Sequence, residues 1–540
     1  MNRRGVLLAS SAALTLPRHV RAQTAEATLL LNTGSEPDSI DPARVSFIGE
    51  VEKVMRVFRN LLAWDATGAL VPDQAASLPV VEDGGRSLIF TLRRGLVYSD
   101  GRPLTARDFE YGWKRHLAPD TRSEYAFAGY VIAGAEAYNT ADPLRTPPEQ
   151  LSALRDATGV RALDDHTLQL TLTAPAPWFL SVLATWCGLP VRADIIGRAG
   201  DRWTEPATYI GNGPYVLAEW DHGSRLRFEA NPLYHAGPPP IRYVEQAMIG
   251  EPAVALAAYL NDELDVAGVQ VEDRSYVQSD ARLRSQFHEY PGGCTFYVGF
   301  NTRKPPFDDA RVRAAFSLAL DRTTFVRNIL GGQGRAARQF VPPAFPGNYL
   351  EIDEQIFDPA RGAQLLAAAG YPGGSGFGEL KWAYSAGARS RVRIEALVNQ
   401  LGQNLGVRIE PDPVEARTFA AALKRPEAVP MLFLAGWCQD YPDPQSWYSI
   451  VFSSRSSLGR TGWNNPDFDR LTAAADTESD PTSRHDLYRA AAQLLVQEAP
   501  AAFLYHSVAW VLVKPRLRGY REDPFEYFLG EHALYDLRLE

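Results

Sequence analysis

Residues 300–313 have the sequence FNTRKPPFDDARVR, in which a proline pair is followed by two acidic residues and a run of helix-forming residues. Asp308 or Asp309 is expected to cap a helix N-terminus, because a carboxylate there accepts hydrogen bonds from free backbone N–H groups. Apolar residues then repeat at helical spacing from Val312 to Leu320, and Gly331-Gly332 is a stop signal. The pattern predicts one helix that continues to these glycines.

Strands and helices are mixed along the rest of the chain, without an internal repeat. A capping box of Thr105 and Asp108 predicts a helix over 106–117, and Asp-Pro pairs predict helices beginning at Pro359 and Pro481 and ending near Gly370 and Pro500. Apolar and polar residues alternate, as in half-buried strands, over 88–92, 166–172 and 225–229. The fold class is therefore α/β.

Length and charge restrict the classes of function. The chain has 540 residues, 45% of them hydrophobic, which predicts two to four globular domains at roughly 100 to 200 residues each. It carries 55 basic and 64 acidic residues, a formal net charge of −9. An acidic balance disfavours binding to nucleic acid or to an anionic membrane surface.

The N-terminus predicts export from the cytoplasm. Arg3-Arg4 precede an apolar stretch over 6–16, and Val20-Arg21-Ala22 forms a small-residue cleavage site, so residues 1–22 are expected to be a signal peptide. The sequence fits both an ordinary secretory signal and the twin-arginine type. Because no cysteine follows the apolar core, we expect no lipid anchor there and a soluble mature protein outside the cytoplasm.

The cysteines and the missing motifs limit the chemistry. Cys187, Cys294 and Cys438 allow one disulfide and one free thiol, in any of three pairings. The nine histidines form no HExxH-type pair, so no metal site is expected. P-loop and GxSxG motifs are missing, and the GxG near residue 332 follows a helix rather than a strand. We therefore expect no cofactor and no enzymatic activity.

Four sequence segments, collinear over nearly the whole mature chain, carry a resemblance to a known family. They are GSEPDSIDP at 34–42, YSDGRPLTARDF at 98–109, GNGPY at 211–215 with Trp220 and NPLY at 231–234, and FNTRKPPFDDARVR at 300–313. From about Leu29 onward, the chain resembles the extracytoplasmic solute-binding proteins of the oligopeptide/dipeptide-binding family. These are the receptor components of ABC importers.

This resemblance implies a two-lobed α/β fold with a hinge and an additional domain, in which the lobes close around the ligand. Domain I is then expected over 23–58, 189–293 and 507–540, the extra domain II over 59–188, and domain III over 294–506. The expected function is a monomeric periplasmic receptor that captures short peptides, or related amine-bearing solutes, in extended form. It would deliver them to an ABC permease in the inner membrane.

The same resemblance assigns a binding segment over 434–444, with the sequence LAGWCQDYPDP. Gly436, Trp437 and Cys438 match the segment that pairs with the peptide backbone, as a strand added to a sheet edge. Asp440 matches the aspartate that binds the peptide amino group, whose buried charge needs a partner; a solvated loop acid is the alternative. Family members also have a disulfide at this place, which implies Cys294–Cys438 and leaves Cys187 as a free thiol.

Other ligand contacts are expected only because the residues match positions in the family. Tyr125, Tyr297, Trp437, Tyr505 and His506 match positions near the ligand, although each also fits an ordinary core residue. Leu434 stands where oligopeptide receptors have a basic residue for the ligand carboxylate. Basic residues that could replace it are Lys424, Arg425, Arg389 and Arg391.

Two other functions remain open at this point. A receptor of the same fold could bind an opine, a nickel chelate, haem or an oligosaccharide, because fold does not determine the ligand. An exported peptidase is the second alternative, and the missing nucleophile or metal triad disfavours it.

Overall fold

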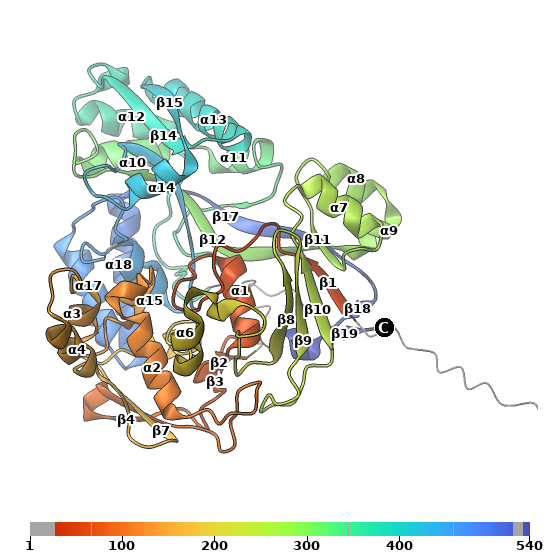
Figure 1. Ribbon diagram of the computed structural model, residues 1–540. Coiled ribbons are helices and arrows are strands. Elements are labelled where there is room, and N and C mark those ends of the chain that lie inside the picture. Colours follow the sequence, from red (N-terminus) through yellow and green to blue (C-terminus); the bar gives the residue numbers. More distant parts are fainter. Residues whose placement is uncertain (1–27, 66, 344, 457, 522–532) are drawn as a thin grey trace, which may run out of the picture.

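The computed structural model describes residues 28–65, 67–343, 345–456, 458–521 and 533–540. The predicted signal peptide lies outside the described residues. Within them the chain forms three larger sheets and two two-stranded pairs, surrounded by helices (Figure 1).

Two long antiparallel strands connect the parts of the molecule. β12 (Phe287–Phe300) and β17 (Ala501–Val513) pair along most of their length and run from the base of the upper lobe in Figure 1 to the region of β11 (Val266–Gly268). One end of the pair belongs to a buried cluster with α7, α8 and α9, and the other end to the core of the upper lobe. The helices of the first cluster are α7 (Pro252–Leu260), α8 (Arg274–Ser279) and α9 (Ala281–Gln286).

The upper lobe, at the top of Figure 1, continues the same sheet in the order β12-β16-β14-β15. α13 presents Ile394, Leu397, Leu401 and Leu405 to this core, at the three- and four-residue spacing of one helix face. The strands are β13 (Arg335–Ala336), β14 (Glu379–Ser385), β15 (Arg408–Val414) and β16 (Leu432–Cys438). The helices are α10 (Ala310–Leu318), α11 (Arg322–Asn328), α12 (Pro359–Ala368), α13 (Ala388–Leu405) and α14 (Ala416–Leu423).

A second sheet, in the order β1-β10-β9-β8, stands beside α1. A third, in the order β4-β5-β7-β6, lies within residues 59–188 and packs with α2. The strands of both are β1 (Thr28–Asn32), β4 (Val80–Glu82), β5 (Ser87–Thr91), β6 (Val160–Ala162), β7 (Thr167–Thr171), β8 (Tyr215–Asp221), β9 (Arg225–Ala230) and β10 (Tyr243–Ala247).

The shorter elements and remaining helices complete the chain. The helices are α1 (Ile48–Val57), α2 (Ala106–His116), α3 (Ala135–Asn139), α4 (Pro148–Asp156), α5 (Phe179–Val182), α6 (Ala193–Ala199), α15 (Pro444–Trp447), α16 (Ser449–Phe452), α17 (Pro466–Thr477), α18 (Pro481–Glu498) and α19 (Ala533–Asp536). The strand pairs are β2 (Leu62–Trp64) with β3 (Leu70–Pro72), and β18 (Leu517–Arg518) with β19 (Arg538–Leu539).

Most local predictions are confirmed, and one is wrong. The capping box at Thr105 forms, with its backbone N–H donating to Asp108 Oδ2 at 2.8 Å, and the predicted strands become β5, β7 and β9. The helix predicted from residue 310 to the glycines is instead two helices, α10 and α11. Asp321 caps the second, and the buried Arg322 guanidinium donates to the carbonyls of Ser317, in the last turn of α10, and of Leu320, between the two helices.

The domain boundaries predicted from the sequence stay a prediction. The β4-β5-β7-β6 sheet falls wholly within 59–188, and the long strands β12 and β17 cover the predicted transitions near residues 294 and 506.

Candidate functional site

The end of strand β16 has an open backbone edge. β12 pairs with β16 on one side from Leu432 to Cys438, whereas β14 pairs on the other side only with Leu432 and Phe433. From Leu434 to Cys438, no strand of the described residues covers the second side. A free strand edge presents unpaired N–H and C=O groups and can accept another extended chain.

The register decides which backbone groups face that edge. Cys294 and Cys438 are directly opposite, with Cα atoms 4.0 Å apart, which is typical of a pair that does not exchange hydrogen bonds. Because the two kinds of pair alternate, Leu434, Gly436 and Cys438 direct their N–H and C=O groups away from β12. The open edge therefore offers donors and acceptors at every second residue, as in a sheet.

The opposite strand, β12, leaves no room for a side chain at Gly436. A Cβ atom at this position would lie 2.9 Å from the Phe296 ring. That ring stacks on Tyr505 with centroids 4.7 Å apart, so it has little freedom to move away. A glycine keeps β16 close to β12 at the centre of the open edge.

The predicted disulfide is confirmed. Cys294 and Cys438 are bonded across the two strands and join positions 144 residues apart. Cys187 is a free, buried thiol whose pKa burial raises to about 12, so it stays protonated at physiological pH. The bridge fixes the strand end from which the chain turns to Asp440.

Asp440 lies in a cavity of about 200 Å³ beyond the end of β16. Its Oδ1 accepts a hydrogen bond from the Tyr125 hydroxyl at 3.1 Å, while its buried Oδ2 has no hydrogen-bond partner. Its backbone N–H donates to Ser446 Oγ at 3.2 Å, which holds the turn. Burial raises the pKa of this carboxyl to about 7, and the bond from Tyr125 lowers it in part. A carboxylate so placed is suited to a cation that enters the cavity.

The walls of the cavity are mainly apolar and aromatic. Among the predicted residues, the structure brings together Tyr125, Trp437, Cys438 and Asp440. The cavity is lined by Ser46, Phe47, Ile48, Val51, Tyr125, Trp186, Trp437, Cys438, Gln439 and Asp440.

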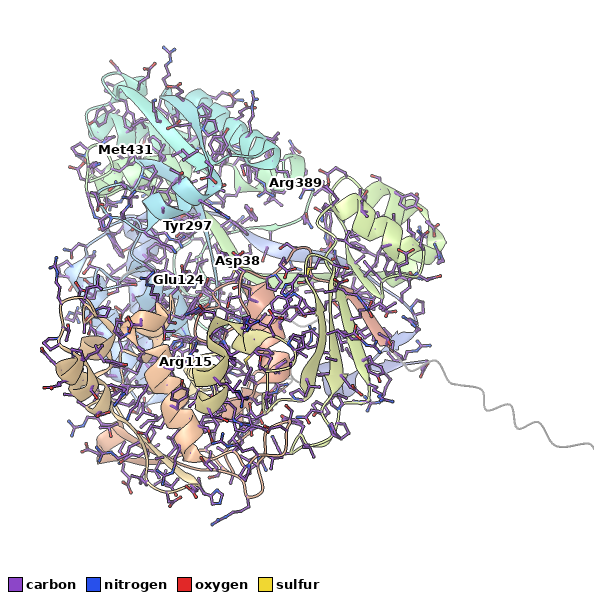
Figure 2. The ribbon with its side chains drawn as sticks, viewed as in Figure 1. Asp38, Arg115, Glu124, Tyr297, Arg389 and Met431 are labelled. Atoms are coloured by element: carbon purple, nitrogen blue, oxygen red, sulfur yellow. A yellow bond between two sulfur atoms is a disulfide. The ribbon has the colours of Figure 1, made fainter. Side chains whose placement is uncertain are left out.

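Residues far apart in the sequence meet beside this cavity. Tyr125 reaches Asp440, Lys424 pairs with Glu124 at 2.9 Å, and the rings of Trp178 and Tyr441 stack with centroids 6.3 Å apart. In Figure 2, Glu124 lies on the side of α2 that is nearest to the upper lobe. The cavity is thus built by segment 59–188 and segment 294–506, together with residues 46–51.

The chain matches a known family over most of its length. Residues 69–458 match the model of bacterial extracellular solute-binding proteins, family 5. The Escherichia coli periplasmic oligopeptide-binding protein OppA is 30% identical over 92% of this chain and 91% of its own. The chain belongs to family 5.

Two further proteins are similar to this chain, one of them a solved structure that shows the fold, and their names indicate different ligands. The solved structure of the Escherichia coli murein tripeptide binding protein MppA is 28% identical, with a TM-score of 0.79, and the match covers 95% of this chain and 99% of that one. A probable deoxycholate-binding periplasmic protein of Escherichia coli, YgiS, is 30% identical over 92% of this chain and 91% of its own. The predicted two-lobed fold of periplasmic binding proteins is confirmed. The family and these relatives are binding proteins.

Three residues that were predicted to contact the ligand lie in the core and do not line this cavity. Tyr297 is buried against Phe340, and Tyr505 stacks on Phe296 as described. His506 Nδ1 lies 2.8 Å from the Thr295 hydroxyl, and burial lowers its pKa to about 3, so the ring is neutral. Their contact with ligand stays a prediction, and the geometry of His506 favours the alternative of a satisfied core histidine.

The basic residues proposed for a ligand carboxylate are already paired or exposed. Arg389 donates to Gln270 at 2.8 Å, on the flank of the upper lobe that faces α7 to α9 (Figure 2). Arg391 pairs with Glu395 at 2.7 Å. Arg425 is exposed in the turn after α14, outside the cavity lining.

The sequence prediction missed the other lining residues, which are Ser46, Phe47, Ile48, Val51, Trp186 and Gln439. All but Gln439 come from distant segments, which no local pattern connects to Asp440. Gln439 stood inside the quoted binding segment, and its place before Asp440 was the available signal. In the described ranges, no group of three or more His, Cys, Asp or Glu side chains could hold a metal ion, and no helix is long and apolar enough to cross a membrane.

Proposed function

We propose that this protein is the substrate-binding receptor of an ABC importer that captures short peptides in extended form. The observation that carries the proposal is the open edge of β16, which ends at the Asp440 cavity. A peptide added along Leu434–Cys438 offers complementary backbone groups whatever its sequence.

The peptide amino group is held by Asp440. An ammonium that leaves water needs a charged partner, and the unpartnered Oδ2 supplies one, whereas Tyr125 holds Oδ1. In this proposal Trp437, Gly436 and Cys438 also contact the peptide, because they lie on the same strand end. The names of the relatives OppA and MppA support a peptide ligand.

Capture occurs between two lobes that close about the crossing strands β12 and β17. In this proposal domain I comprises 23–58, 189–293 and 507–540, domain II 59–188 and domain III 294–506. Closure requires only that the ligand bind the closed arrangement better than the open one. The protein acts as a periplasmic monomer after removal of residues 1–22, delivers its ligand to an inner-membrane permease, and catalyses no reaction.

Native mass spectrometry of protein purified from the periplasm tests the proposal. Ligand released from the complex is sequenced by fragmentation. We expect a ladder of short peptide masses with free amino termini. A single non-peptide mass, such as a bile acid or haem, would overturn the peptide assignment and leave the fold unchanged.

A further inference from the structure

Gln439 has a buried amide without hydrogen bonds. Its side chain is 2% exposed, and neither Oε1 nor Nε2 has a partner. Its backbone N–H donates to Gly293 O at 3.1 Å, which fixes the position of the residue. Two other buried glutamines differ: Gln339 and Gln355 each use both the amide nitrogen and the amide oxygen, on Tyr349 and on the backbone of β17.

An unsatisfied buried amide is costly, because it has lost its hydrogen bonds to water and gained none in return. Nearly all buried polar groups in proteins have a partner. Gln439 lines the same cavity as Asp440, so a ligand group that reaches its amide from the cavity can supply both the missing donor and the missing acceptor.

The surroundings restrict the chemistry of that ligand group. Trp186 and Trp437 also line the cavity, and their buried indole N–H groups have no partner. Asp440 is the one charged side chain among the lining residues. A second carboxylate would be repelled by Asp440 and would leave Gln439 Oε1 unpaired, and an aliphatic group would leave the whole amide unpaired.

We propose that Gln439 selects ligands whose first residue has a neutral side chain with both a donor and an acceptor, a carboxamide above all. The inference rests on the proposed function, because Asp440 must hold the amino group of that same residue. A carboxamide can form two hydrogen bonds with the Gln439 amide, one in each direction. Its oxygen retains a lone pair for an indole N–H.

Calorimetric titration with three tripeptides tests this selection. Asn-Ala-Ala, Leu-Ala-Ala and Asp-Ala-Ala have first side chains of similar size and differ in hydrogen-bonding capacity and charge. At pH 7.5 we expect Asn-Ala-Ala to bind about tenfold more tightly than Leu-Ala-Ala, and Asp-Ala-Ala to bind more weakly than Asn-Ala-Ala. These comparisons need only the unaltered protein.

A variant then assigns the preference to one side chain. Gln439→Met keeps the length of the side chain and removes its hydrogen bonds, so we expect Asn-Ala-Ala and Leu-Ala-Ala to bind within about twofold of each other. The matched control, Gln403→Met, alters an exposed glutamine on α13 and should keep the original order.

The outcomes separate the two proposals. If the unaltered protein binds the peptides but does not prefer Asn-Ala-Ala, or if Gln439→Met keeps that preference, the role of Gln439 is wrong and the peptide receptor stands. If none of the three peptides binds, the proposed function itself fails.

Discussion

The Tyr125 hydroxyl donates a hydrogen bond of 3.1 Å to Oδ1 of Asp440, and the two residues are 315 positions apart in the sequence. The bond crosses from segment 59–188 to segment 294–506. It holds one carboxylate oxygen in place and leaves the other without a partner at the cavity. The cationic end of a ligand would therefore be bound by a group that both segments position.

Tyr125→Phe tests this positioning. The hydrogen bond lowers the pKa of Asp440, so its removal should raise that pKa further and leave less carboxylate near neutral pH. We expect a free-amine tripeptide to bind roughly three- to tenfold more weakly at pH 7, with a smaller loss at pH 8.5. Titration calorimetry at both pH values measures this, and equal losses would show that the bond does not act through ionisation.

The burial of Asp440 should reduce the stability of the ligand-free protein. Its pKa of about 7 lies above the usual 3.8, so the folded protein binds this proton more tightly than the unfolded chain does. The stabilisation from the bound proton is complete below about pH 4 and is lost as the pH rises through about 7.

Asp440→Asn removes this ionisation. We expect the variant to be more stable than the parent by about 2 to 4 kcal/mol at pH 8, with a difference that shrinks towards pH 4. Denaturant unfolding at the two pH values measures it. A variant that is less stable than the parent at pH 8 would contradict the charge-burial argument.

Gly436→Ala should disturb the centre of the open edge. The added Cβ would approach the Phe296 ring to 2.9 Å, and the ring is stacked on Tyr505. Overpacking of this kind costs about 1 to 3 kcal/mol. Gly268→Ala, in β11, is the matched control because a Cβ there meets nothing within 4 Å. Similar melting temperatures for the two variants would refute the packing argument.

The Cys294–Cys438 disulfide should stabilise the fold, because it closes a loop between positions 144 residues apart. The double substitution Cys294→Ser with Cys438→Ser is expected to reduce the free energy of unfolding by about 2 to 4 kcal/mol. Cys187→Ser alters the buried thiol and leaves the bridge intact. Unchanged stability of the double variant would mean that the strand pairing alone holds β12 against β16.

Local sequence patterns predicted the secondary structure well where residues close together in the sequence determine it. The capping residues Thr105 and Asp358, and the alternation in β5, β7 and β9, all predicted their elements. The prediction of one long helix after residue 310 was wrong because Arg322 is buried and donates to the Phe503 carbonyl and to Gln355 Oε1, tertiary contacts that helical spacing does not reveal.

The residues that line the candidate cavity were predictable only in part. Asp440, Trp437 and Cys438 are neighbours in the sequence, so one motif located all three. The remaining walls come from Ser46 and Phe47 before α1, from Ile48 and Val51 in α1, and from Trp186, and they join the cavity only after the segments have packed. Tyr505 and His506 matched by position, yet their side chains pack on Phe296 and Thr295.

The most direct test of the account compares a free-amine tripeptide with its N-acetylated form, on the parent and on Asp440→Asn, by titration calorimetry at pH 7.5. If Asp440 holds the peptide ammonium, acetylation should weaken binding to the parent by about a hundredfold and have little effect on the variant. Equal losses on acetylation in both proteins would contradict the role of Asp440.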